Sequence, residues 1–127
     1  MNSILQQFKD NLVSFLDELI DVFPSESELI LLRIFIKDQI PTEDILNKFI
    51  YSINKNDNEI RNYIKQRNDI VFTNADFFQA ITQIKTMNFR KLWVSDLLDE
   101  NEKEMFWKWI ESFVSLSDKY ITKKNEL

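Results

Sequence analysis

The sequence contains no glycine, no histidine and no cysteine. Average usage supplies roughly nine glycines to a chain of this length, so their absence strongly constrains the backbone. Phosphate-binding loops, dinucleotide-binding fingerprints and nucleophile elbows all need glycine where a side chain would clash. The sequence therefore excludes these three classes of site.

The absence of histidine and cysteine removes further chemistry. A Ser-His-Asp triad, a cysteine nucleophile and the ordinary zinc, haem and iron–sulfur sites all need one of these residues. Disulfides are equally impossible, so nothing indicates an oxidising compartment. We expect a protein that is not an enzyme and that has no cofactor and no resident metal.

Long apolar runs are also missing. The densest one, from Leu29 to Ile36, contains Arg33 and is far shorter than the roughly 20 residues of a membrane span. The formal net charge of −5 disfavours generic attraction to nucleic acid or to an anionic membrane. The first residues are acidic, whereas a transit peptide is rich in arginine. We expect a soluble, cytoplasmic protein without a membrane partner.

The composition that remains is typical of one globular domain. Apolar residues make up 44% and charged residues 29% of the chain, and eleven phenylalanines can help to fill a sizeable core. A chain of 127 residues has the size of one ordinary domain, and it contains no internal repeat or linker. We therefore expect a single domain over residues 1–127, with a frayed tail over residues 122–127.

Apolar residues recur at helical spacing in the first part of the chain. A stripe over residues 4–23 predicts a helix that ends before Pro24. Ser25 or Ser27 is the expected cap of the next helix, whose residues 29–36 are apolar almost all round. A helix of this kind is expected to be the central and most buried one. A buried strand is the alternative, but no hairpin turn accompanies it.

The pattern is more broken beyond this point. Thr42 follows Pro41 as the expected cap of a third helix, which the polar stretch 54–58 interrupts. Asp99 and Glu102 have the spacing of a capping box before the last helix. Between the polar stretch 54–58 and the last helix, the sequence predicts a short helix with Ile60, Tyr63 and Ile64, followed by an extended segment Ile70–Phe72. A segment bearing Phe77, Phe78, Ile81 and Ile84 comes next, and then one or two helical turns over 89–94. We expect an all-α bundle of five or six helices, with the first, second and last long helices as its core.

The last helix carries two tryptophans, on different sides of its apolar arc. On a helical wheel, Trp109 lies about 60° from Phe106 and Trp107 lies about 100° away on the other side. We therefore predict that Trp109 is the more buried, and that a half-exposed Trp107 joins Val114 in a surface for a protein partner. The alternative, which is the commoner role of this side chain, is that both tryptophans belong to the core.

Two kinds of charged group have competing interpretations. The pairs Asp17/Asp21 and Glu100/Glu104 lie one turn apart and have the ligands of a Mg²⁺ site, but carboxylates are also usual on solvated helix faces, and we predict no metal site. Basic residues interleaved with aromatics are typical of single-strand nucleic-acid binding. Two groups have this pattern, Lys85, Arg90 and Lys91 near Phe89 and Trp93, and Arg61, Lys65 and Arg67 near Tyr63. Salt pairing with the surplus carboxylates is the interpretation that we favour.

Residues 60–121 include the stretches "IRNYIKQRNDIVF", "FF" and "LWVSDLLDENEKEMFWKWIESFVSLSDKYI". The acidic, asparagine-containing cap before a tryptophan-rich helix that ends in Asp-Lys-Tyr resembles small helical proteins of large nucleocytoplasmic DNA viruses. The resemblance implies a viral source, a place in the virion or the host cytoplasm, and a non-enzymatic role. It carries over no functional residue.

These observations together predict a non-catalytic interaction or structural protein. Its expected partner is another protein, either a virion component or host factor, or a second copy of the same chain. The alternative function is a nucleic-acid-associated accessory factor that uses Lys85, Arg90 and Lys91, although the acidic chain makes nucleic acid the less favoured partner.

Overall fold

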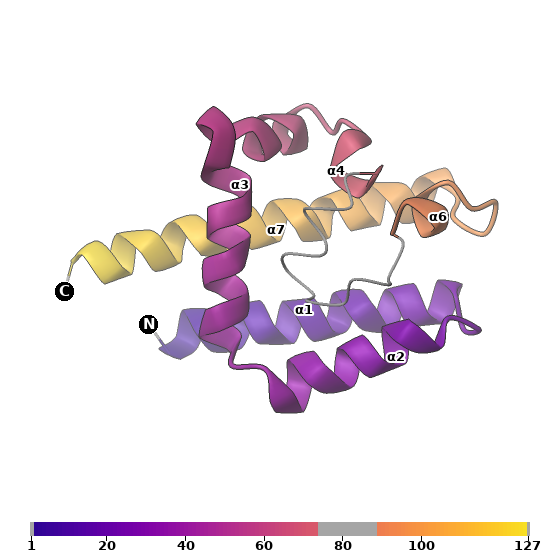
Figure 1. Ribbon diagram of the computed structural model, residues 1–127, viewed down its shortest axis with the longest axis horizontal. Helices are drawn as coiled ribbons and strands as arrows, with labels where there is room; N and C mark the ends of the chain where they lie inside the picture. Colours follow the sequence, from indigo (N-terminus) through magenta and orange to yellow (C-terminus); the bar gives the residue numbers. More distant parts are fainter. Residues whose placement is uncertain (1, 74–88, 127) are drawn as a thin grey trace.

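The computed structural model describes residues 2–73 and 89–126, and within these ranges every regular element is a helix (Figure 1). This confirms the all-α bundle. The segment with Phe77, Phe78, Ile81 and Ile84 lies outside the described residues, as does Lys85. The helices are α1 (Asn2–Val22), α2 (Ser27–Ile34), the π-helical η1 (Phe35–Gln39), α3 (Thr42–Lys65), α4 (Ile70–Thr73), α6 (Phe89–Trp93) and α7 (Glu100–Asn125).

The two longest uninterrupted helices, α1 and α7, lie side by side and run in opposite directions (Figure 1). Helix α2 returns along α1, and α3 crosses both α1 and α7. Because α1 and α7 run in opposite directions, the beginning of α1 and the end of α7 lie on the same side of the molecule. The short helices α4 and α6 pack together near the beginning of α7. No helix in the described ranges has the length and apolar content needed to cross a membrane.

The core is organised around Phe113 of α7, which is 2% exposed. Its ring centroid lies 5.5 Å from that of Phe8 and 5.9 Å from that of Phe15, both on α1. The ring of Phe49 on α3 lies 6.2 Å away with its plane at 84°, the edge-to-face arrangement that aromatic quadrupoles favour. The central helices are therefore α1, α3 and α7.

This arrangement corrects the prediction that the second helix is the most buried one. In α2 and η1 only Leu29, Leu32 and Ile36 are buried, and these three side chains lie on the side that faces α1. The apolar side chains on the opposite side are exposed because no other described helix packs against that side. Helix α3, which was not among the three helices predicted to form the core, takes the central position instead.

The second helix, α2, ends in the π turn η1, and the cause is local. The N–H of Ile40 donates to the carbonyl of Phe35, five residues earlier, at 2.8 Å. Pro41 has no N–H to continue the helix and forces the residue before it into an extended conformation, here φ −105° and ψ 126°. The caps expected for the second and third helices, Ser25 or Ser27 and Thr42, are not the cap residues of α2 and α3. Glu26 and Pro41 occupy these positions, and neither makes a side-chain cap hydrogen bond.

The polar turn predicted at 54–58 is confirmed as an interruption of α3. Lys55 leaves the helical conformation with ψ 158°, and Asn56, Asp57 and Asn58 follow with φ of 54°, 57° and 65°. Asparagine and aspartate tolerate this left-handed region best among residues with a side chain. In a chain without glycine they are the residues that permit so sharp a change of direction.

Four other local predictions have mixed outcomes. Residues 70–73 form a helical turn rather than an extended segment, because Asn68 Oδ1 accepts a hydrogen bond of 3.0 Å from the N–H of Ile70 and starts a helix. At α7 the predicted cap is confirmed, since Asp99 Oδ1 accepts from the N–H of Glu102 at 2.8 Å. The predicted short helix near 89–94 is present as α6, and the tail expected to fray continues α7 through Asn125.

Candidate interaction surfaces

Trp107 is buried, with 5% of its surface exposed, and this overturns the prediction that it is the more exposed tryptophan. Its ring packs edge-on against Phe72 of α4 and Trp93 of α6, with centroids 4.9 and 5.8 Å away. Trp109 is only partly buried, and its Nε1 donates to Glu18 of α1 at 2.7 Å. The short helices α4 and α6 cover the flank of α7 that the helical wheel left open, so the geometric reason for a partner contact at Trp107 is lost.

Val114, the other predicted contact residue, is partly buried and lies in an open groove of about 680 Å³. The groove runs between the beginning of α1 and the second half of α7, and most of the surface that lines it is apolar, although six of its eight lining residues are polar. Its lining residues are Ile4, Glu111, Val114, Ser115, Asp118, Lys119, Thr122 and Lys123. Both of its carboxylates, Glu111 and Asp118, have arginine partners, so the groove offers a partner few uncommitted acids.

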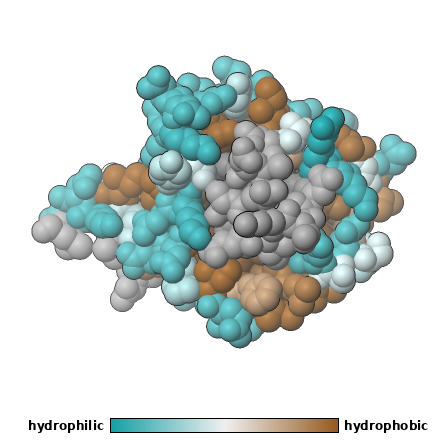
Figure 2. Space-filling view, viewed as in Figure 1, coloured by the Kyte–Doolittle hydropathy of each residue, from teal (hydrophilic) through white to brown (hydrophobic). Residues whose placement is uncertain are grey.

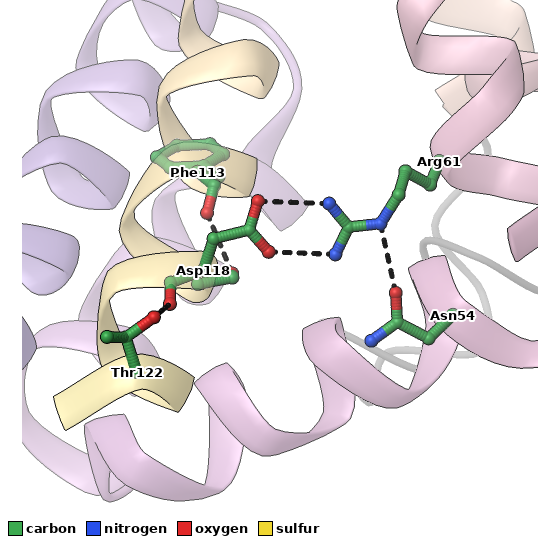
Figure 3. A network of polar contacts seen from close by, with 6 residues as sticks. Asn54, Arg61, Phe113, Asp118 and Thr122 are labelled. Atoms are coloured by element: carbon green, nitrogen blue, oxygen red, sulfur yellow. Dashed lines mark hydrogen bonds and ion pairs between the residues drawn. The ribbon is translucent and has the colours of Figure 1, made fainter. Parts of the chain in front are cut away.

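The first of these ion pairs joins α3 to α7. The two terminal nitrogens of Arg61 donate to the two carboxylate oxygens of Asp118, each at 3.0 Å, and Nε donates to Asn54 at 3.0 Å (Figure 3). Each of the three nitrogens of the Arg61 guanidinium therefore donates a hydrogen bond, two to Asp118 and one to Asn54. A bidentate pair of this kind fixes the relative orientation of the two helices as well as the distance between them.

The second pair lies farther along the same interface. Arg67 donates to both oxygens of Glu111 and also to Glu104. The hydrogen bond to Glu111 is the main reason that the pKa of the Arg67 guanidinium lies above its ordinary value. Arg67 has φ 51°, the conformation that glycine usually supplies after a helix, and here it ends α3. The predicted salt pairing of this basic group is confirmed for Arg61 and Arg67.

The three basic residues of the alternative nucleic-acid patch have different outcomes. Lys85 is outside the described residues, Arg90 is exposed, and Lys91 lies 3.5 Å from Glu26 in an ion pair. Of the carboxylate pairs weighed above as Mg²⁺ ligands, each has one member in an ion pair, Asp17 with Arg33 and Glu104 with Arg67. In the described part of the chain, no group of three or more acidic residues is arranged to hold a metal ion.

Four of the exposed large apolar side chains among the described residues lie together on the consecutive segments α2 and η1. Ile30, Leu31, Ile34 and Phe35 are 44%, 51%, 45% and 42% exposed, and we call these four residues the α2 face. Their spacing of one and four residues places them on one side of the helix, opposite the side that packs on α1. Figure 2 shows hydrophobic residues gathered along the lower edge of the molecule, where α2 lies in Figure 1.

The area of the α2 face sets it apart from scattered exposed residues. Side chains exposed to this extent together present roughly 400 Å² of apolar surface, within the range of the largest patch on a typical monomer, which is often functional. The sequence pattern carried the signal for this surface. A helix that is apolar on every side is fully buried only if neighbours cover every side, and no other described helix packs against the side that carries the α2 face.

Comparisons of the chain with protein-family models, with characterised proteins and with solved structures find no match.

Proposed function

We propose that this protein is a non-catalytic interaction protein and that it binds a protein partner through the α2 face. The observation that supports the proposal is the exposure of four large apolar side chains, each above 40%, on one side of a helix whose other side is anchored in the core. The resemblance of residues 60–121 to viral helical proteins suggests a virion protein or a host factor as the partner class.

The magnitude of the surface fits a partner of moderate affinity. Burying roughly 400 Å² of apolar surface contributes about 10 kcal/mol at 25 cal/mol per Å². Association itself costs an estimated 4–15 kcal/mol in lost translation and rotation, so only part of this gain remains. The helix is already formed and its buried side is fixed by Leu29, Leu32 and Ile36, which reduces the further cost of ordering the surface.

A matched pair of double variants tests the proposal. Leu31→Gln/Ile34→Gln replaces the centre of the α2 face with polar side chains that retain good helix propensity. Val94→Gln/Leu97→Gln makes the same kind of change at residues that are 64% and 62% exposed between α6 and α7. Circular dichroism and thermal unfolding first establish that both variants are folded.

The measurement is crosslinking in cells that express the protein, followed by identification of the crosslinked peptides. We expect crosslinks from residues beside the α2 face, such as Lys37, to a partner protein. They should be lost in the α2 variant and retained in the Val94/Leu97 variant. Identical crosslinks in both variants would show that the α2 face is not the binding surface.

A further inference from the structure

We draw no further inference here: the strongest candidate, the open groove between the beginning of α1 and the second half of α7, is lined by two carboxylates already paired with arginines and by two lysines, one of which pairs with Glu126, and nothing among the described residues shows what covers it.

Discussion

The ring of Trp107 meets the ring of Phe72 edge to face, with centroids 4.9 Å apart and planes at 80°. Phe72 also stacks flat on Trp93, with centroids 3.8 Å apart and planes at 3°. These three rings belong to α7, α4 and α6. Helices of four or five residues are not stable by themselves, so this aromatic packing is what holds α4 and α6 in place.

The first prediction concerns Trp107. Replacing it with alanine should lower the free energy of unfolding by about 3–5 kcal/mol, the usual cost of truncating a buried large aromatic residue. Trp109→Ala should cost less, because the Trp109 ring is partly exposed and its main polar contact is with Glu18. Urea unfolding followed by circular dichroism measures both values.

The order of these two losses is the decisive result. If Trp109→Ala destabilised the protein more than Trp107→Ala, the aromatic cluster with Phe72 and Trp93 would not be the structural element described above. Leu97→Ala serves as a control, since the exposed Leu97 should change stability by no more than about 0.5 kcal/mol.

The tryptophans show what a helical wheel can and cannot predict. The wheel correctly placed Phe106, Ile110 and Phe113 on the buried side of α7. It failed for Trp107 because it describes one helix and contains no information about neighbours that come from distant parts of the sequence. The segment with Phe72 was predicted to be extended, and the covering role of α4 and α6 therefore could not be recognised.

The second prediction concerns the centre of the core. Phe113→Ala should cost about 3–5 kcal/mol, because the cavity would face rings from both α1 and α3 that cannot all move into it. Phe113→Leu should cost less, since it leaves a smaller cavity. A loss below about 1 kcal/mol for the alanine variant, measured by urea unfolding, would contradict the position of Phe113 in the core.

The α2 face illustrates the same limit from the opposite side. The apolar residues 29–36 and the stop at Pro41 identified the helix from the sequence. Whether its excess apolar surface is buried or exposed depends on how many helices pack around it, and the local pattern does not contain that number. Caps and turns were more predictable, as Asp99 and the stretch 54–58 show, because their geometry depends on residues close in sequence.

The third prediction is a dependence of stability on pH that arises from Glu102. Burial, and secondarily the nearby carboxylate of Asp99, raise the pKa of Glu102 above its ordinary value of 4.5. Its Oε2 atom is buried and has no hydrogen-bond partner among the described residues. The folded state therefore favours the protonated form more strongly than the unfolded state does.

The sign of the effect follows from this difference. Below pH 4.5 both states hold the proton and Glu102 imposes no penalty, whereas above it the unfolded state loses the proton first and stability falls until the folded state ionises too. Glu102→Gln should therefore raise stability relative to wild type at neutral pH and lose this advantage in acid. Thermal unfolding across this pH range measures it, with Glu100→Gln as the exposed control in the same helical turn. An advantage that does not change with pH would contradict the prediction.

The last prediction concerns the turn inside α3. Asp57 has φ 57° and lies between two asparagines that are also in the left-handed region, where a side chain on Cβ approaches the following carbonyl oxygen. Glycine adopts this conformation without that clash, so Asp57→Gly should raise the free energy of unfolding by about 0.5–1 kcal/mol despite the greater freedom of the unfolded chain. Lys48→Gly is the matched control, because the exposed Lys48 is in the regular part of α3 and glycine there should cost about 0.7–1 kcal/mol. Urea unfolding of the two variants should give changes of opposite sign, and a loss of stability in both would show that residue 57 does not hold a left-handed conformation in solution.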